Sequence, residues 1–524
     1  MSRNRNAALA LFIVLSLFGR GEAAVVNARS VSQSDVGVAI ASAKDGDTVI
    51  VPAGTASWTS TLVISKAITL QGAGIGQTII QDDLAANGNN LVISTSSDKF
   101  YRLSGFEFRP GARTTRFRKG CVVVIGTSKT FRIDHCKFNG IHNRLIYTRN
   151  AVCGVIDHCT FIAEKGGRSI AIFHDAWAGK LWGDGSWATP IDWGSPNAVY
   201  IEDNNFSSSD PRDRYGLIDE YAGARFVFRY NKATNGIIAS HGTGSTARNR
   251  GVRQWEIYNN TLTSNPPTAE NAMHMRGGTG VVFANTTTGF LKFVTLNTYR
   301  YKTGFRYWSG SDGTSGWDLN DPKLYATGTA GLGSGIGPNG NGGKLVVPGA
   351  GWLTNQWVGY SIRDLDGLSN IQPPRKHSRK PTTSKSNSQT PDSKGDGPGP
   401  FFGAIASNTS DTIIVRGGSQ QPNKIFAAGD RFEIRRVIQS LDMIGASTGE
   451  LLSGATPSPR WLKQEIEPVY VWNNTKDGVA NSGVAIAPDP AIKEGVHFFN
   501  NVAKPNYKPL VYPHPLVTKD ATKP

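Results

Sequence analysis

The sequence has little cysteine and methionine, with four of each among 524 residues. The cysteines, at positions 121, 136, 153 and 159, all lie in one part of the first half. They therefore cannot form a disulfide framework for the whole chain, although an exported protein could hold a local bridge. The scarcity of methionine beside 60 glycines argues against a helix-rich protein and predicts a chain of short strands and turns.

Acidic residues are also scarce relative to basic ones. Asp and Glu total 40, whereas Lys and Arg total 56, which gives a formal net charge of +16. This balance disfavours cationic partners and favours polyanions, such as an acidic polysaccharide, a lipopolysaccharide surface or nucleic acid. No Gly-rich segment ends in the Lys-Ser or Lys-Thr of a phosphate loop, so no nucleotide partner is expected.

Long hydrophobic runs are missing beyond the first residues of the chain. The one apolar run, residues 7–18, follows Arg3 and Arg5 and precedes small residues. It is too short to cross a bilayer and has the layout of a secretory signal peptide, which we place at residues 1–24. We therefore expect an exported protein, secreted or periplasmic, without a membrane span. Export makes an acidic polysaccharide a better partner than nucleic acid.

One phrase recurs along the chain. Strands end alike in "RIDHCKF", "VIDHCTF", "YIEDNNF", "VFRYNKA", "EIYNNTL" and "VVFANTT". The shared position is occupied by Cys136, Cys159, Asn204, Asn231, Asn260 and Asn285, and later by Asn474 and Asn501. A repeated strand that ends in Asn and a short turn suits one coil of a parallel β-helix, because a single coil cannot bury its own apolar face and stacked coils bury it jointly.

Two consequences follow for the start of this stack. Stacked asparagines can pass hydrogen bonds from coil to coil, and Cys136 and Cys159 hold the first two positions of the same ladder. We expect these cysteines to be stacked buried thiols or one disulfide, and not metal ligands. Ahead of the coils, "SQSDVGVAIASAK" carries apolar residues at helical spacing, which predicts a short helix that caps the open end of the stack.

The segment "AIASAKDGDTVIVPAGTASW…ITLQGAG", followed by the Asn-ended strands, resembles secreted bacterial proteins of the right-handed parallel β-helix, pectin-lyase-like superfamily. The resemblance spans residues 30–300 and 466–505. It implies an all-β fold, a right-handed parallel β-helix. It leaves the activity open, because the superfamily includes polysaccharide lyases and hydrolases, esterases, phage tailspikes and adhesins.

The ladder divides the chain. We assign residues 25–299 to the β-helix, residues 300–465 to a loop-rich excursion, and residues 466–524 to the final coils and a C-terminal tail. Alternating strands within the excursion predict an inserted small β module. The basic, Pro- and Ser-rich segment 373–400 is expected to be disordered.

Polar residues end the strand that precedes each ladder strand. They are Arg149, His174 with Asp175, Asp219 with Glu220, His241, and His274 with Arg276. Their separations follow those of the ladder, so we expect them to stack on one exposed face, along a lateral groove. The catalytic candidates are Asp219, Glu220, His241, Arg250, His274 and Arg276.

The one long step of the ladder is an insertion rich in tryptophan. It holds Trp177, Trp182, Trp187 and Trp193. Aromatic rings stack on sugar faces while polar groups take the hydroxyls. We therefore assign the four tryptophans to substrate binding, together with His174, Asp175 and Arg253. The alternative is a loop whose tryptophans pin it to the wall of the solenoid.

These groups favour a polysaccharide lyase that acts on uronates. In β-elimination a base removes the proton beside the uronate carboxylate, and cations neutralise that carboxylate. Arginine, lysine or a Ca²⁺ ion can neutralise, and Ca²⁺ is the one cofactor that we consider. A tailspike-like hydrolase, with Asp175 and either Asp219 or Glu220 as its two carboxylates, stays open. A non-catalytic carbohydrate- or surface-binding β-helix, monomeric or trimeric, stays open as well.

One segment has a more specific likeness. "FRYNKATNGIIASHGTG" is similar to the Arg-Tyr-Asn … His-Gly segment of β-helical alginate lyases and chondroitinases. In those enzymes an arginine precedes the His-Gly pair, whereas Ser240 stands there in this chain, and their upstream lysine has no counterpart. The catalytic pair of those enzymes is therefore not carried over to this sequence.

Overall fold

The computed structural model describes residues 23–85, 87–97, 99–112, 120–140, 144–163, 167–208, 215–243, 249–297, 318–320, 323–338, 342–358, 360–366, 401–415, 426–435, 437–448, 464–487 and 492–518. Nearly all of the expected signal peptide and the whole of segment 373–400 lie outside the described residues. No helix in the described part is long and apolar enough to cross a membrane.

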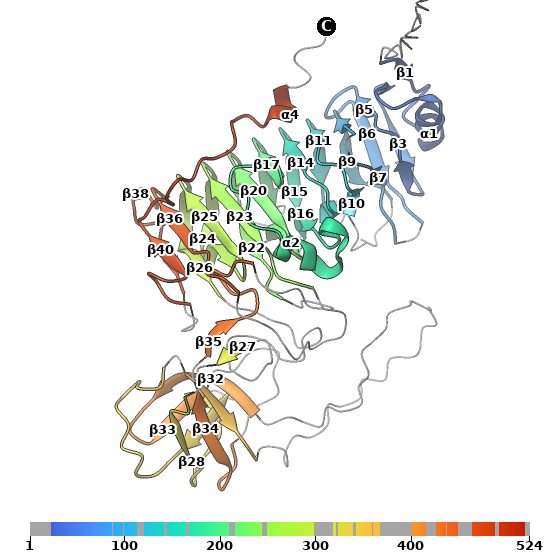
Figure 1. The fold of residues 1–524 in the computed structure, drawn as a ribbon. Helices are drawn as coiled ribbons and strands as arrows, with labels where there is room; N and C mark the ends of the chain where they lie inside the picture. Colours follow the sequence, from blue (N-terminus) through green and yellow to red (C-terminus); the bar gives the residue numbers. More distant parts are fainter. Residues whose placement is uncertain are drawn as a thin grey trace, which may run out of the picture.

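The solenoid consists of three columns of parallel strands, to which successive coils add (Figure 1). The first column is a 12-stranded sheet made of β1 (Val25–Asn27), β2 (Thr48–Val51), β5 (Thr69–Gly72), β8 (Tyr101–Ser104), β11 (Phe131–Asp134), β14 (Gly154–Asp157), β17 (Val199–Glu202), β20 (Arg225–Arg229), β23 (Gln254–Tyr258), β25 (Thr279–Phe283), β36 (Val469–Trp472) and β40 (Phe498–Asn500). The second column begins with β3 (Gly54–Trp58), β6 (Thr78–Asp82), β9 (Glu107–Pro110), β12 (Lys137–Asn139), β15 (Thr160–Ala163), β18 (Asn205–Ser208) and β21 (Lys232–Thr234).

The third column carries the candidate site. It begins with β4 (Leu62–Ile64), β7 (Leu91–Thr95), β10 (Gly120–Gly126), β13 (Arg144–Asn150), β16 (Arg168–Phe173), β19 (Tyr215–Tyr221) and β22 (Gly236–Ser240). The long strands β24 (Thr261–Met275) and β26 (Thr286–Leu296) pass through both the second and the third column, which close with β37 (Thr475–Lys476) and β39 (Ala485–Ile486). This is the parallel β-helix that the repeat predicts.

The corner between the first and second columns is the asparagine ladder. Oδ1 of Asn231 accepts from the backbone nitrogen of Asn204 at 3.0 Å and from its Nδ2 at 3.1 Å. Oδ1 of Asn260 does the same for Asn231 at 2.9 and 3.1 Å. The same pair of bonds continues through Asn285 to Asn474. The predicted ladder is therefore confirmed over these five positions.

The two ends of the ladder have different outcomes: the asparagine expected at the last position is not part of it, and the cysteines at the first positions are free thiols. Asn501 is not part of it: Val471 pairs with Asn500, so Asn501 lies level with Trp472, and it is exposed. Its assignment to the series is therefore wrong. At the other end, the described cysteines are all free and buried, so the stacked-thiol alternative holds rather than the disulfide. The backbone nitrogen of Cys159 donates to Oδ1 of Asn204 at 2.8 Å and joins the thiols to the asparagines.

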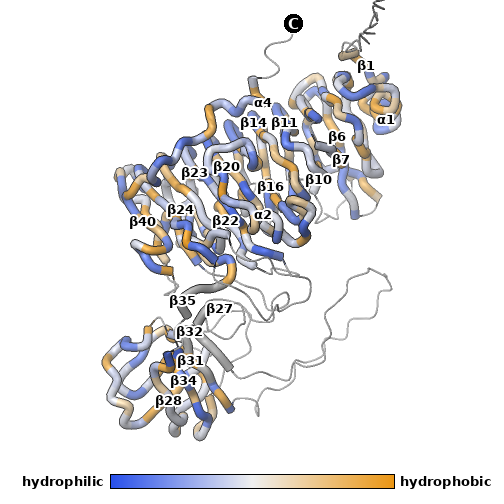
Figure 2. The backbone as a smooth tube through the Cα atoms, in the orientation of Figure 1, coloured by the Kyte–Doolittle hydropathy of each residue, from blue (hydrophilic) through white to orange (hydrophobic). Residues whose placement is uncertain are grey.

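Repetition also fills the interior. Phe108, Phe138, Phe161 and Phe206 form one stack, with ring centroids 5.3, 5.3 and 4.7 Å apart. Identical positions lie above one another at about the strand spacing of 4.8 Å, so a side chain that fits one coil fits the next. Figure 2 accordingly shows hydrophobic and hydrophilic residues interleaved along the coils rather than gathered in one block.

Helix α1 (Gln33–Ser42) lies at the first end of the solenoid, where the helical spacing predicts it, and contacts β1 to β4 (Figure 1). Ser32 caps it by accepting from the backbone nitrogen of Asp35 at 3.2 Å. At the other end of the helix, the amine of Lys66 donates to the carbonyls of Ile40 at 3.1 Å and Ala43 at 2.6 Å. Helix α1 buries Val36, Ala39 and Ile40, and so covers apolar surface of the first coil.

The excursion contains a separate antiparallel sheet with its own core. Its strand order is β28 (Ala326–Thr329), β34 (Arg431–Arg435), β31 (Ser361–Asp364), β32 (Phe401–Asn408), β33 (Thr412–Val415), β30 (Gly343–Val346) and β29 (Gly335–Ile336). A further antiparallel pair joins β27 (Asp318–Asn320) to β35 (Val437–Ser440). After β35, Met443 and Ile444 are buried in the core of the solenoid. The chain therefore returns to the solenoid before β36 begins.

The C-terminal tail runs back across the first column as far as α4 (Pro515–Thr518), which contacts β14 (Figure 1). The guanidinium of Arg229 donates to the carbonyl of Leu510 at 2.7 Å, and the guanidinium of Arg132 donates to that of Val517 at 3.2 Å. The ring of Tyr512 stacks on that of Tyr230 at 3.7 Å. The tail thus covers part of the outer face of the first column. The third column carries the polar strand ends that the sequence singles out.

Candidate functional site on the third column

Strand register decides which side chains of the third column face outward. Ile170, Ile218 and Ile238 pair from coil to coil and are buried in the core. Successive residues of a strand alternate between faces, so residues one position away point to the outer face. The strand register places Ala171, Asp219, Ala239 and His274 in one outward row. A second outward row contains Phe173 and Tyr221 and continues into His241.

His241 and Asp219 form the centre of the outward face. Nε2 of His241 lies 2.8 Å from Oδ1 of Asp219. His241 is 8 % exposed and Asp219 is 3 % exposed. Burial opposes ionisation of Asp219, but the hydrogen bond from His241 and the charges around it outweigh burial and lower its pKa. Burial and the charge of Arg276 lower the pKa of His241 to about 3.

These protonation states fix the tautomer of the histidine. An ionised Asp219 can only accept, so Nε2 of the neutral imidazole carries the proton and donates to it. Nδ1 of His241 then carries a lone pair, and it has no hydrogen-bond partner among the described residues. The arrangement therefore holds a buried acceptor nitrogen, and a carboxylate orients it from the opposite side of the ring.

Three arginines lie around this pair, and a fourth lies further along the column. Nη2 of Arg144 lies 3.1 Å from Oδ2 of Asp219, and Nε of Arg168 lies 3.9 Å from its Oδ1. Arg276 donates to the carbonyl of Ser240, beside His241. Further along the column, Arg149 is paired with Asp175, which also accepts from the backbone nitrogen of Asn150 at 2.9 Å. Positive charge therefore exceeds negative charge on this face.

An aromatic strip runs through the same face. The rings of Tyr147 and Phe173 meet edge to face at 5.0 Å, and those of Phe173 and Tyr221 at 4.8 Å. Tyr221 then stacks on the imidazole of His241 at 3.8 Å. Burial raises the pKa of Tyr147 to about 12, so its hydroxyl stays protonated at neutral pH. The strip and the arginines offer both apolar ring faces and cations.

Sequence reasoning missed these three rings. Tyr147, Phe173 and Tyr221 lie in "RLIYTRN", "SIAIFHDAW" and "GLIDEYA", the segments in which only polar residues were selected. The signal that could have found them is the alternation of the strands, because each ring stands an odd number of positions from a core isoleucine. His274 does belong to this face. Its Nε2 lies 2.8 Å from Nδ2 of Asn297, and burial lowers its pKa to about 4.

Glu220 does not lie on the outward face, which contradicts the expectation of one exposed stack. It pairs in register with Ile172 and Ser240, is 0 % exposed, and its carboxylate oxygens have no partner among the described residues. Burial raises its pKa well above the ordinary value, so this carboxyl is neutral inside the coil. The physical reason is the period of two: a difference of one residue moves a side chain to the opposite face.

His174 is displaced from the face for the same reason. It follows Phe173 and is 0 % exposed. Nε2 of His174 lies 3.0 Å from the carbonyl of Val152, and its Nδ1 accepts from the backbone nitrogen of Arg225 at 3.1 Å. Burial lowers its pKa to about 4. Both ring nitrogens are thus used within the protein, and the side chain does not reach the outward face where it was expected.

The tryptophan-rich insertion packs on the protein rather than presenting its rings. It includes η1 (Trp177–Gly179), η2 (Leu181–Gly183) and α2 (Asp184–Ala188). Trp177 and Trp187 are 7 % and 1 % exposed, and Nε1 of Trp187 donates to the carbonyl of Gly251 at 2.9 Å. Trp182 is half-buried, as is Trp193, which donates to Glu467 at 3.3 Å. The alternative of a loop pinned to the wall therefore describes Trp177 and Trp187.

Arg250 and Arg253 lie beneath this insertion and not on the outward face. Arg250 is 1 % exposed, and its Nη2 and Nε lie 2.6 and 2.8 Å from the carboxylate of Asp442. Arg253 is 0 % exposed, with its guanidinium carbon 4.9 Å from the centre of the Trp187 ring. Sequence proximity to His241 suggested a place in the site, but the chain leaves the third column after Ser240 and turns the corner to β23.

The described residues of the outward face do not fit a calcium site. No group of three or more His, Cys, Asp or Glu in the described part of the chain is arranged to hold a metal ion. Calcium prefers several oxygen ligands, whereas Asp219 and Asp175 are each already paired with cationic side chains. Whether the protein requires calcium stays a prediction, which an assay with chelator tests.

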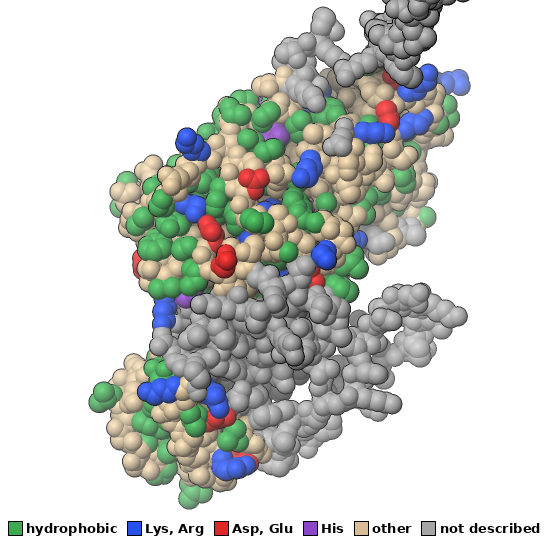
Figure 3. Space-filling model, in the orientation of Figure 1, with side chains coloured by type: hydrophobic (Ala, Val, Ile, Leu, Met, Phe, Trp, Pro, Cys, Tyr) green, Lys and Arg blue, Asp and Glu red, His purple; other side chains and the backbone are tan. Residues whose placement is uncertain are grey.

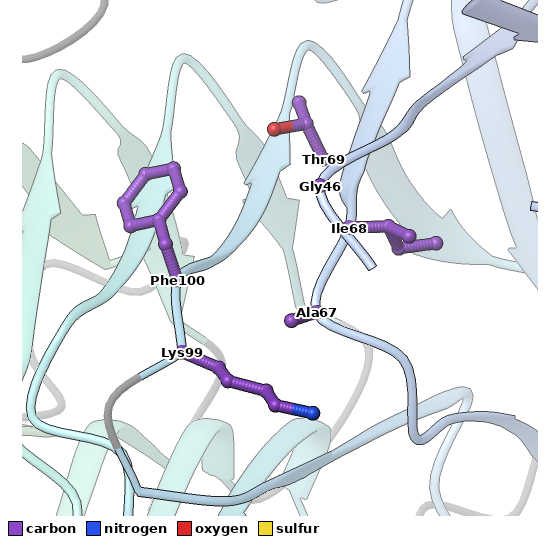
Figure 4. Close-up of a pocket in the computed structure, with 6 residues that line it drawn as sticks. All are labelled: Gly46, Ala67, Ile68, Thr69, Lys99 and Phe100. Carbon is purple, nitrogen blue, oxygen red and sulfur yellow. The ribbon is translucent and has the colours of Figure 1, made fainter. Parts of the chain in front are cut away.

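Two other surfaces are less suited to chemistry. On the face that Figure 3 presents, the Lys, Arg, Asp and Glu side chains of the solenoid stand apart from one another, without a broad patch of one sign among the residues drawn in colour. A pocket near the first end is lined by Gly46, Ala67, Ile68, Thr69, Lys99 and Phe100 (Figure 4). Its one charged side chain, Lys99, is paired with Asp45 at 2.6 Å. Neither surface places a histidine beside several arginines, as the outward face of the third column does.

The sequence matches no protein-family model and no curated protein. Solved structures do match. An alginate lyase from Paenibacillus sp. str. FPU-7 aligns over 52 % of this chain and 99 % of its own, with 14 % identity and a TM-score of 0.35. A mutant tailspike protein of E. coli bacteriophage HK620, in complex with a pentasaccharide, aligns over 74 % of this chain and 87 % of its own, with 10 % identity and a TM-score of 0.28.

A mutant of the PL6-family alginate lyase AlyGC aligns over 52 % of this chain and 51 % of its own, with 15 % identity and a TM-score of 0.21. Likenesses at this level do not bear on activity. The parallel β-helix is established by the strand pairing described above, and any function has to be argued from the residues of the outward face.

Proposed function

We propose that this chain is an exported protein that binds an acidic polysaccharide on the outward face of its third column and cleaves it by β-elimination. The observation that carries the proposal is the Asp219–His241 pair among Arg144, Arg168 and Arg276. A uronate needs a cation at its carboxylate and a base beside it, and this face supplies both within one cluster. The aromatic strip supplies apolar surface for the sugar rings.

In the proposed reaction, His241 accepts the proton from the carbon beside the uronate carboxylate. Its Nδ1 forms the new N–H bond, a carbon–carbon double bond forms, and the bond from the neighbouring carbon to the glycosidic oxygen breaks. The imidazolium then returns the proton to the leaving oxygen, so atoms and charges balance. Asp219 holds Nε2 and stabilises the imidazolium while it exists.

The low pKa of His241 in the free protein makes it a weak base, and a bound anionic substrate would raise this pKa. Burial and the charge of Arg276 lower this pKa to about 3. A substrate carboxylate beside Arg276 would offset the cation and raise the pKa of the imidazole. Basicity would thus appear when an anionic substrate is bound, which favours uronates over neutral sugars.

Hydrolysis is the less suitable reaction for this face. A glycoside hydrolase needs one carboxyl group that is protonated near neutral pH, together with an ionised one. The pKa of Asp219 is lowered and its carboxylate is held by cations, and Asp175 is paired with Arg149. Glu220 has a raised pKa, but it lies inside the coil. A proton donor of the hydrolase kind is therefore missing from the outward face as described.

The test is a panel of uronate-containing polysaccharides followed by ultraviolet absorbance, with calcium and with chelator. Rising absorbance reports the new double bond and supports a lyase, provided that His241→Ala and Arg276→Ala abolish it. His158→Ala is the matched control, because that histidine is exposed on a distant corner and stacked on His135. New reducing ends without absorbance would overturn elimination in favour of hydrolysis. Binding without either signal would leave a non-catalytic carbohydrate-binding protein.

A further inference from the structure

The corner beneath the tryptophan-rich insertion contains three buried arginines. Arg225, Arg250 and Arg253 are 0, 1 and 0 % exposed. The ring of Trp187 covers two of them, with its centroid 5.1 Å from the guanidinium carbon of Arg250 and 4.9 Å from that of Arg253. Burial and the charges of the other two arginines lower the pKa of Arg253 to about 9, so it is still charged at neutral pH.

The first two arginines are fully engaged. Arg250 donates to Asp442 at 2.6 and 2.8 Å and to Asp184 at 3.3 Å. Arg225 uses only neutral acceptors: its Nε donates to the hydroxyl of Ser186 at 2.9 Å, and its terminal nitrogens donate to Gln254 and to the carbonyls of Ser186, Thr189 and Pro190. Each of these two side chains therefore satisfies its donors within the protein.

Arg253 differs from both neighbours. Its Nε and Nη1 have no hydrogen-bond partner among the described residues. Its one side-chain hydrogen bond among the described residues runs from Nη2 to the carbonyl of Thr189 at 3.4 Å, near the outer distance limit for such a bond. A guanidinium has five N–H donors, and burying it without partners is costly.

No neighbouring carboxylate is free to balance this charge. Asp442 and Glu467 are the acidic groups whose charge acts on Arg253. Asp442 is bound by Arg250, and Glu467 accepts from Lys504 at 3.0 Å and from Trp193 at 3.3 Å. Arg250 takes the carboxylates of Asp184 and Asp442, and Asp192 acts on Arg225 only through its charge. Arg253 is therefore the one of the three guanidiniums that lacks both a carboxylate partner and partners for most of its N–H donors among the described residues.

We propose that Arg253 holds a small monovalent inorganic anion, of the kind that chloride represents, in the corner under the insertion. Such an ion would accept from the unpartnered nitrogens of Arg253 and supply the negative charge that no described carboxylate places against this guanidinium. Because Thr189 and Trp187 both contact Arg253, the ion would also stabilise the packing of the insertion on the solenoid. The proposal does not depend on the polysaccharide chemistry.

The experiment compares thermal unfolding in sodium chloride and sodium gluconate at matched ionic strength. Wild-type protein should gain a midpoint shift that grows with the logarithm of the chloride concentration above the dissociation constant, because the ion binds the folded state. Arg253→Met should lose the shift, whereas Arg431→Met, which removes an exposed arginine of the β module, should retain it. Equal midpoints in chloride and gluconate across the titration would overturn the proposal.

A second measurement uses the unchanged protein, so it holds even if Arg253→Met fails to fold. Crystals grown in sodium bromide should show anomalous scattering within hydrogen-bond distance of Nε or Nη1 of Arg253. Bromide found only at exposed sites, or a carboxylate of the chain itself against these two nitrogens, would contradict an anion at this position.

Discussion

Replacing Asn231 by alanine should destabilise the solenoid more than any exposed asparagine replacement. Its Oδ1 accepts from the backbone nitrogen and Nδ2 of Asn204, at 3.0 and 3.1 Å. Its Nδ2 donates to the carbonyls of Ile201 and Arg229, both at 2.9 Å, and to Oδ1 of Asn260 at 3.1 Å. The three acceptors share the two N–H groups of Nδ2, so these contacts amount to about four buried hydrogen bonds at about 0.5–1.5 kcal/mol each, and with the orphaned partners the expected loss is about 3–5 kcal/mol.

The matched control for this prediction is Asn205→Ala, because Asn205 is adjacent to the ladder in sequence but exposed on the second column. Denaturant unfolding of both variants, read by far-ultraviolet circular dichroism, measures the difference. We expect Asn205→Ala to stay within about 0.5 kcal/mol of wild type, as surface changes usually do. If Asn231→Ala also stayed within that range, the ladder would not stabilise the corner and the reasoning would be refuted.

Three further predictions concern the interior and the site. The folded protein should lose stability as pH falls from 6.5 toward 4, because the unfolded chain protonates His174 in that window while the folded state, with a pKa of about 4, does not; unfolding midpoints across pH should show a smaller slope in His174→Gln. Trp187→Ala should lower the free energy of unfolding by about 3–5 kcal/mol and leave polysaccharide affinity unchanged at a temperature where the variant is folded. Unchanged stability with weakened polysaccharide binding would instead make this ring part of the sugar-binding surface. Asp219→Asn should lower kcat roughly 100-fold or more, because it removes the charge that orients His241, and it should not weaken binding, because Arg144 and Arg168 keep their charges and lose a competing carboxylate; an unchanged kcat would remove His241 from the reaction.

The sequence predicts the solenoid well because its signal is repeated. A single Asn-ended strand is ambiguous, but the same ending at Asn204, Asn231 and Asn260 reports one corner several times over. Asn501 shows the limit of this reasoning. It is an asparagine that follows a strand, as the ladder residues are, but the pairing of β40 places it outside the ladder.

The sequence locates the candidate site along the chain, but it does not tell which side chains there point outward. His241, His274 and Arg276 do lie at the ends of third-column strands and on the outward face, whereas Glu220 and His174 each stand one residue away from the outward rows, and the catalytic role of all five stays a prediction. Strand ends cannot be located to a single residue from sequence, and with a period of two that error exchanges the core and the surface. The same error concealed the ring of Tyr221.

Contacts between distant segments were beyond sequence reasoning altogether. Asp442, which pairs with Arg250, lies 192 residues away in the chain and belongs to the excursion. Nothing in the local pattern around Arg250 or Arg253 indicates that the insertion covers them. The sequence alone does not distinguish a buried structural arginine from one on the outward face, and only the packing separates them.

The most direct test of the central claim is the crystal structure of His241→Ala with a uronate oligosaccharide bound, since this variant should bind substrate without turning it over. The account predicts the sugar on the outward face of the third column, with a carboxylate within hydrogen-bond distance of Arg276, Arg168 or Arg144 and a ring face against Tyr221 or Phe173. An oligosaccharide on the first column, on the β module or on the far corner at His135 and His158, with the third column empty, would contradict it.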